Sequence, residues 1–386
     1  MIKTLSAYTL EIDDCEKAVS EILSQLDLGK NLLKNSVGIV SCYSEFIESG
    51  VVKALREKLP FDIIGTTTIS GGIAGVNGQL MLSIAVITGD DVSFSTALSQ
   101  PLMPDNFKKH TASAYEDALS RLGQKPAMIF ICSPLFFDIA GDEVIRAIDE
   151  VSGGVPLFGT LAVDHTKDYH TAHTLFNESA SLNRLSMLLI AGNINPSFSV
   201  ASVPEHKIVK QKAIITKSHN NLLIEVNDMP VVDYMTSIGL AANGKIEGLN
   251  TLSFTIDFND GTKPLVRGIF GQTPEGYAIC GGSMPVNATL GIGSVDHDDV
   301  IAMTAEAMKK LPLDKLSSGL FVFSCISRNM ALGFDITAEI DAIENIVGGK
   351  VPYLMAYSGG EICPVYDKDG KPVNRFHNET LITCLF

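Results

Sequence analysis

The chain has 386 residues, a formal net charge of -15 and 46% hydrophobic residues, so it can build two or three domains with substantial cores. The acidic balance, with no basic cluster longer than "FKKH", excludes nucleic acid and anionic membranes as expected partners. No stretch reaches the roughly 18 apolar residues of a membrane span, and the N-terminus lacks a signal peptide's apolar core, so we expect a cytoplasmic protein.

The seven cysteines are scattered along the chain, and none forms a C-x-x-C pair. An odd number without close spacing argues against a disulfide framework and against a structural zinc site. We therefore predict no metal and no cofactor.

Three segments of the chain resemble one another, starting near Val37, Ala127 and Gly319. Each opens with an unbroken apolar run that ends at a cysteine, which is typical of a strand buried on both faces. A helical stripe, a second apolar strand and a third strand follow, the last being "LMLSIAVITG", "RLSMLLIAG" or "ETLITCLF". This order predicts an α/β fold of repeated strand-helix-strand-strand units that form two lobes with mixed sheets.

Different material separates the second and third copies. "AIITKSHNNLLIEVNDMPVVDYM" reads as strands followed by a helix near Pro230, and "KPLVRGIFGQTPEGYAICGG" reads as a hairpin. We place a boundary here, giving a domain of two units at 1–203 and a domain of one unit plus inserted strands at 204–386.

Polar and reactive residues gather where the predicted strands end. Loops after parallel strands open at the carboxyl edge of an α/β sheet, where such folds place ligands. We expect the following residues to face crevices at that edge: Cys42, Thr66, Cys132, Asp164, Cys325, Arg328 and Glu361.

Several blocks in this order resemble the FIST proteins, with the N-terminal and C-terminal FIST domains in tandem. They are "DIIGTTT", "PLFGTLAVDHTKDYHTAHTLFNESAS", "AIITKSHNNLLIEVNDMPVVDYM", "RGIFGQTPEGYAICGG", "FVFSCISRNMALG", "VPYLMAYSGGEICP" and "RFHNETLI", which span roughly residue 35 to the end. The resemblance implies an intracellular sensory module that binds a small ligand, with amino acids or related metabolites as the class. The family's motifs fall on Gly159 and Asp164, on Cys325 and Arg328, on Gly360 and Glu361, and on His377, Asn378 and Thr380. The ligand-binding residues that we expect are Arg328, Glu361, Cys325, Gly360, Asp164, Thr160 and Asn378.

Many FIST proteins are fused to signalling domains, but this sequence leaves no room for a kinase, a cyclase or a DNA-binding domain. We therefore expect a stand-alone sensor that acts through a separate signalling partner protein.

Cys325 has two interpretations. With Arg328 to lower its pKa and His377 as base, it could be the nucleophile of an enzyme acting on a small acyl or thioester substrate. Alternatively it is a small buried side chain in a pocket wall. Cysteines at three similar positions favour the wall, since one nucleophile needs no copies, and a binding role is favoured over catalysis.

Arg328 and Glu361 also have two interpretations. A guanidinium and a carboxylate in one crevice suit the two charges of an α-amino acid, but they could instead form a structural ion pair. The stretch "DHTKDYHTAH" holds Asp164, His165, Asp168, His170 and His173, which could bind a metal but match no common site, and we expect a loop or lid. A protein-interaction scaffold without a ligand pocket is the third functional hypothesis.

Overall fold

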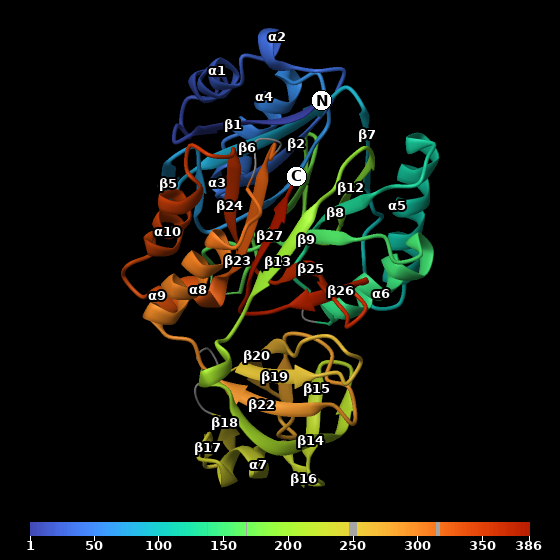
Figure 1. Ribbon diagram of the computed structural model, residues 1–386, viewed down its shortest axis with the longest axis vertical. Coiled ribbons are helices and arrows are strands. Elements are labelled where there is room, and N and C mark those ends of the chain that lie inside the picture. Colours follow the sequence, from blue (N-terminus) through green and yellow to red (C-terminus); the bar gives the residue numbers. More distant parts are fainter. Residues whose placement is uncertain (137, 167, 247–252, 314–316) are drawn as a thin grey trace.

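The computed structural model describes residues 1–136, 138–166, 168–246, 253–313 and 317–386. Figure 1 shows two lobes, a large main body above and a small barrel of strands below. The main body contains helices over mixed sheets, so the predicted α/β fold with two lobes is confirmed. In the described part of the chain, every helix is too short or too polar to cross a membrane.

The three predicted units are present, and all of them belong to the main body. In each, the first strand pairs in parallel with the second and antiparallel with the third. Unit one comprises β2 (Asn35–Cys42), α3 (Glu45–Glu48), α4 (Val51–Lys58), β3 (Ile63–Thr67) and β6 (Leu82–Gly89). Unit two comprises β8 (Met128–Ser133), α6 (Gly141–Ser152), β9 (Leu157–Leu161) and β12 (Ser186–Gly192). Unit three comprises β23 (Leu320–Cys325), α9 (Ile326–Leu332), α10 (Ala338–Val347), β24 (Tyr353–Ser358) and β27 (Leu381–Leu385).

Each unit is preceded by a further strand and helix that the comparison of the three segments did not include. The strand extends the unit's sheet by pairing with its third strand. These strands are β1 (Ile2–Thr9), β7 (Val92–Leu98) and β13 (Ser197–Ala201), and the helices that follow are α1 (Cys15–Leu26), α2 (Leu28–Asn31), α5 (Phe107–Leu122) and α8 (His297–Lys309).

Short hairpins link the three units in a closed cycle. Hairpin β4 (Gly71–Ile73) with β5 (Val76–Gly78) of unit one pairs with β24 of unit three. Hairpin β10 (Thr174–Phe176) with β11 (Ser179–Ser181) of unit two pairs with β3 of unit one. Hairpin β25 (Glu361–Tyr366) with β26 (Pro372–His377) of unit three pairs with β9 of unit two. Each unit therefore completes its neighbour's sheet.

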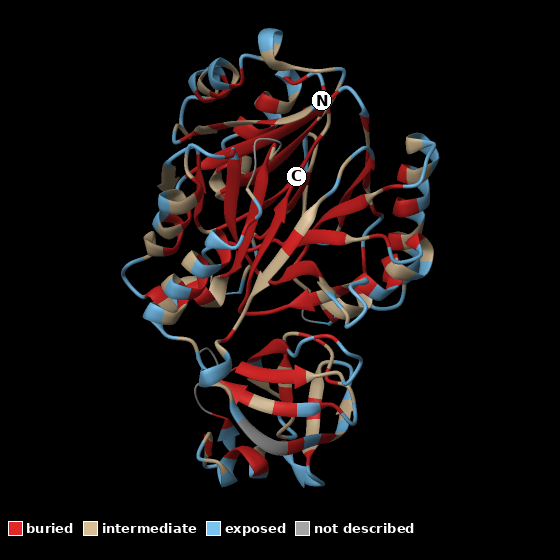
Figure 2. Ribbon diagram, in the orientation of Figure 1, coloured by how far each residue is buried: buried red, intermediate tan, exposed pale blue. Residues whose placement is uncertain are grey.

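The inner faces of the three sheets share one core, whereas the helices cover their outer faces. Phe130 and Phe158 of unit two pack on Phe323 of unit three, with ring centroids 5.9 and 5.6 Å apart. Figure 2 shows the central strands buried and the outward sides of the helices exposed. The first strand of each unit is covered on both sides, which explains its unbroken apolar sequence.

The cysteines at or next to the ends of the three first strands are not equivalent. Cys132 belongs to the shared core, and Cys325 has the same alternation as the inward-facing Phe321 and Phe323. Cys42 instead packs in the outer core of unit one with its helices. In β2 the residue that continues the inward-facing series of Val37 and Ile39 is Ser41, one position before Cys42. The sequence therefore suggested a third equivalent cysteine that the structure does not contain.

The barrel contains its own core and lies between β13 and α8 in the sequence. Its strands are β14 (Val209–His219), β15 (Leu222–Val226), β16 (Met229–Pro230), β19 (Ser253–Asp257), β20 (Leu265–Gln272), β21 (Ala278–Cys280) and β22 (Thr289–Gly293). They form one sheet, which the pairing of β14 with β15 closes. The remaining elements are η1 (Glu205–Lys207), α7 (Val231–Ser237), β17 (Ala241–Ala242) and β18 (Lys245–Ile246). Strands β14 and β15, the hairpin of β20 with β21 and the helix near Pro230 are as predicted. The division into domains at 203/204 stays a prediction.

A buried ion pair joins the barrel to the main body. The guanidinium of Arg267 on β20 is fully buried and donates to Asp142 on α6 over 2.8 Å and to the carbonyl of Phe376 over 2.9 Å. Asp142 also accepts from the backbone N–H of Ser283 over 2.7 Å. The barrel is thereby attached to units two and three.

Candidate ligand-binding site

A pocket of about 830 Å³ lies where the three units meet the barrel, a size typical of small-molecule sites. Unit one contributes Tyr43, Ile69 and Gln79, and unit two contributes Leu135, Asp164, His165, Thr166, Asp168 and Tyr169. Unit three contributes Cys325, Ile326, Ser327, Asn329, Met330, Gly359, Asn378 and Glu379, and the barrel contributes Gly268 and Phe270. We call this the central pocket.

The central pocket brings together only part of the predicted site. Cys325, Asp164 and Asn378 line it. Arg328, Glu361, Gly360 and Thr160 are all buried and are absent from its wall. The strand ends therefore converge as expected, but four of the seven residues that we assigned to the ligand do not line this pocket.

Arg328 is held in a buried ion pair. Its Nε and Nη2 donate to Oε1 of Glu339 over 3.0 and 2.7 Å, and Nη2 also donates to Thr304 over 2.9 Å. Glu339 is fully buried on α10 and accepts from Ser324 as well. A guanidinium without water needs a counter-charge, and Glu339 supplies it. Among the described residues, the ion pair between Arg328 and Glu361 that we considered is not formed.

Glu361 is fully buried and is not among the residues that line the central pocket. Its Oε2 accepts from the hydroxyl of Thr380 over 2.9 Å, while Oε1 has no partner among the described residues. Burial raises the pKa of Glu361 well above its ordinary value of 4.5. Burial therefore disfavours the charged form of Glu361, although the hydrogen bond from Thr380 and the charge of Arg328 act in the opposite direction.

Cys325 has the properties of an unreactive side chain in a pocket wall. Burial, with the nearby Glu361 carboxyl, raises the pKa of its thiol, so little thiolate forms at neutral pH. His377 is buried, and its Nε2 lies 2.9 Å from the carbonyl oxygen of Cys363. Burial lowers the pKa of His377 to about 3. Among the described contacts no hydrogen bond joins Cys325 to His377, so an activated thiol pair is not assembled.

Asp164 organises the loop that covers one side of the pocket. Its Oδ1 accepts from the N–H and hydroxyl of Thr166 over 2.7 and 2.6 Å, and its Oδ2 accepts from the N–H of Thr171 over 2.6 Å. Although burial acts to raise the pKa of Asp164, these hydrogen bonds hold it below its ordinary value. His165 stacks on Tyr43 at 4.7 Å between ring centroids, which fixes this loop against unit one.

The His-rich stretch behaves as a loop. Both carboxylate oxygens of Asp164 are used by threonines of the same loop. Across the residues that the structure describes, no group of three or more His, Cys, Asp or Glu side chains is arranged to hold a metal ion.

Sequence reasoning missed Glu379, which follows the expected ligand residue Asn378 in the turn between β26 and β27. Glu379 is 9% exposed and has a left-handed backbone with φ of 56°. Its Oε2 accepts from the hydroxyl of Ser253. Burial raises the pKa of Glu379 from 4.5 to about 7. A charged residue in a turn between two apolar strands was the signal available in "RFHNETLI".

Comparison with known domains decides the family. The FIST N domain matches residues 36–229, and the FIST C domain matches residues 226–364. The chain belongs to the FIST family. FIST domains are associated with sensory signal transduction and small-ligand binding. No curated protein matches the chain.

Solved structures resemble this FIST chain only distantly. Cyanuric acid hydrolase from A. caulinodans aligns over 100% of this chain and 99% of its own, with 10% identity and a TM-score of 0.40. PurLQS from Thermotoga maritima has 9% identity and a TM-score of 0.22, and T. maritima PurL complexed with AMPPCP has 10% and 0.21. Each of these two aligns over 100% of this chain and 72% of its own.

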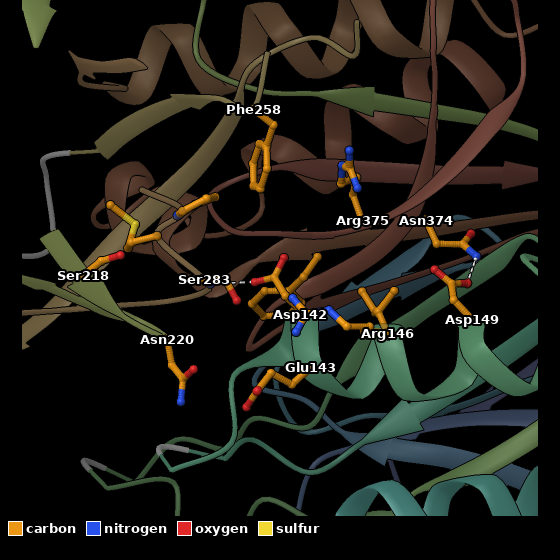
Figure 3. Close-up of a pocket in the computed structure, with 14 residues that line it drawn as sticks. Asp142, Glu143, Arg146, Asp149, Ser218, Asn220, Phe258, Ser283, Asn374 and Arg375 are labelled. Atoms are coloured by element: carbon orange, nitrogen blue, oxygen red, sulfur yellow. Dashed lines mark hydrogen bonds between the residues drawn. The ribbon is translucent and has the colours of Figure 1, made fainter. Parts of the chain in front are cut away.

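A second pocket of about 420 Å³ lies between α6, β26 and the barrel of the FIST chain (Figure 3). Asp142 points toward Ser283, and Asn374 donates to Asp149 over 2.6 Å. Arg375 forms an ion pair with Asp260, as Asp142 does with Arg267. These ion pairs connect the barrel to the main body, so we interpret the second pocket as part of the interface between the two lobes.

Proposed function

We propose that this FIST chain is an intracellular sensor that binds a small metabolite, an amino acid or a related compound, in the central pocket. The observation that carries the proposal is the origin of the pocket wall in all three units and the barrel. A ligand there would touch every part of the molecule, so its binding free energy could favour one arrangement of the parts over another.

The composition of the wall suits a small organic molecule. Apolar and aromatic surface comes from Leu135, Tyr169, Phe270, Ile326 and Met330. Buried polar groups from unit three stand among them. Sites for metabolites commonly combine much apolar surface with a few placed polar groups. The scaffold hypothesis required no such pocket, and the enzyme hypothesis required a thiolate that burial of Cys325 disfavours.

Strand β20 links the central pocket to the ion pair between the barrel and the main body. Gly268 and Phe270 line the pocket, while the adjacent Arg267 pairs with Asp142 on α6. A shift of β20 on ligand binding would therefore act on the ion pair that joins the lobes. A separate partner protein that reads the position of the barrel would complete the signal.

Thermal unfolding against a metabolite library tests the proposal. A ligand specific for the folded state stabilises it by about 2.7 kcal/mol at a hundredfold excess over its Kd, which raises the Tm. Gly268→Ala should weaken that effect, because a Cβ there would lie 3.1 Å from Oε1 of Glu379 inside the pocket. Gly271→Ala on the same strand is the matched control, since its Cβ would make only an ordinary contact at 3.7 Å.

No Tm shift from any compound would contradict the proposal, as would shifts of equal size in the wild type and in Gly268→Ala. An unchanged response in Gly271→Ala would show that substitution in β20 is not harmful in itself.

A further inference from the structure

The turn between β26 and β27 places two polar side chains in the pocket wall without a full set of partners. Asn378 is 1% exposed, and neither its amide oxygen nor its amide nitrogen has a hydrogen-bond partner among the described residues. Leaving such buried groups unpaired costs free energy of folding. A ligand that supplies the missing partners would recover that cost, so the amide is a built recognition point.

The barrel approaches this amide closely because it presents glycine there. A Cβ at Gly281 would lie 2.3 Å from Oδ1 of Asn378, and the N–H of Gly281 donates to the carbonyl of Gly268 over 2.9 Å. Gly268 in turn borders Oε1 of Glu379. The amide and the carboxyl group therefore share one corner of the pocket, between unit three and the barrel.

One carboxylate oxygen of Glu379 is available to a ligand in this corner of the pocket. Ser253 donates to Oε2, and no described residue donates a hydrogen bond to Oε1. Because the carboxyl group is buried, its charged form lacks the water that would normally stabilise it. A cation bound at Oε1 would replace that water.

The charges of the pocket favour a cation. The described lining residues include three carboxylates, Asp164, Asp168 and Glu379, and neither a lysine nor an arginine. The nearby guanidinium of Arg328 is neutralised by Glu339. A ligand carboxylate would therefore enter without a counter-charge from these residues, whereas an ammonium group would find Glu379.

We infer that the ligand of the central pocket is a cationic amine with an apolar body, whose ammonium group donates to Oε1 of Glu379 and Oδ1 of Asn378. The inference rests on the proposed function, because it concerns the same pocket. The apolar body packs on Phe270, Ile326 and Met330. Within the proposed class, it selects decarboxylated or otherwise amine-bearing metabolites over zwitterionic amino acids.

Calorimetric titration with matched probes tests this inference. The probes are hexylamine, cyclohexylmethylamine and phenethylamine, each with its N-acetyl amide and with a carboxylic acid of equal length. At pH 8 at least one amine should bind at least tenfold more tightly than its amide and its acid. Glu379→Gln should abolish this preference, Asn378→Ala should weaken amine binding, and Gly271→Ala should leave it unchanged. Circular dichroism of each variant checks that it is folded.

The outcomes separate this inference from the proposed function. Amides or acids that bind as tightly as the amines would overturn the inference alone. So would a library ligand that is neutral, zwitterionic or anionic and loses affinity in Gly268→Ala. If none of the probes binds, but the library yields a cationic amine that loses affinity in Gly268→Ala, the inference stands. No ligand at all would remove the proposed function and the inference with it.

Discussion

At the scale of single residues, two of the most deeply buried charged side chains pair with each other and stabilise the fold. Arg328 and Glu339 are 1% and 0% exposed in their side chains and lie 2.7 Å apart. Removing one partner of a buried pair leaves an uncompensated charge, which costs about 3–5 kcal/mol. We expect Arg328→Ala to lower the free energy of unfolding by that amount in urea titrations.

The control is Lys310→Ala, because Lys310 pairs with Glu306 at the surface, where the two side chains are 71% and 66% exposed. Its effect on the free energy of unfolding should be much smaller than that of Arg328→Ala, because water and salt screen an ion pair at the surface. Equal costs for the two substitutions would show that the pair of Arg328 and Glu339 does not support the fold.

Glu379 should make stability depend on pH. Because burial raises its pKa from 4.5 to about 7, the folded chain binds this proton more tightly than the unfolded chain. Its contribution is fully present below pH 4.5 and is lost as the pH rises through about 7, a change of up to ~3 kcal/mol. The wild type should therefore lose more stability than Glu379→Gln between pH 5 and pH 8.

Urea unfolding of both proteins at the two pH values measures this difference. Glu361 has a raised pKa as well, but it is present in both proteins and its effect cancels to first order. Identical pH profiles would contradict the burial of a titrating Glu379.

The reactivity of the cysteines separates a pocket wall from a nucleophile. Six of the seven are buried, and Cys15 is partly exposed. We expect iodoacetamide at pH 7.5 to modify Cys15 first, with Cys325 reacting only on unfolding, because its raised thiol pKa and its burial both slow the reaction. Peptide mass spectrometry reads out each site. Rapid modification of Cys325 alone in the native protein would restore the enzyme hypothesis.

At the scale of elements, neighbouring parallel strands lie so close together that some positions have no room for a side chain. A Cβ at Gly159 on β9 would lie 2.1 Å from the carbonyl oxygen of Ile131 on β8, and β25 pairs on the other side. We expect Gly159→Ala to destabilise the protein by roughly 1–3 kcal/mol. Gly29→Ala in α2 is the control, since nothing lies within 4 Å and alanine favours helix by up to ~1 kcal/mol. Thermal unfolding that ranks the two in the opposite order would contradict the strand packing.

The sequence revealed elements more readily than their pairings. Unbroken apolar runs and helical stripes predicted the three units because burial on both faces leaves a local signal. The exchanged hairpins were not predicted, since strands as short as Gly71–Ile73 carry little periodicity and pair with residues such as Met355, far along the chain. The one-residue shift at Cys42 has the same origin, because the side of a strand depends on register.

The candidate site was predicted in outline for a similar reason. Residues at strand ends converge by topology, which located Cys325, Asp164 and Asn378. Which charge pairs with which depends on three-dimensional neighbours, and so Glu339 was not foreseen as the partner of Arg328. The resemblance to FIST proteins supplied the family, and it did not point to Glu379.

At the scale of the whole molecule, hairpin exchange makes the three units one body, to which the barrel is joined by Arg267 and Asp142. The central pocket lies where these parts meet, so a ligand there can act on their arrangement.

The central claim is that a small ligand binds in the central pocket. A crystal structure of the chain with its strongest library ligand tests this most directly. The account predicts electron density for the ligand between Phe270 and the turn of Asn378 and Glu379. Density in the second pocket beside Asp142 and Arg375, or only on the surface, would contradict it.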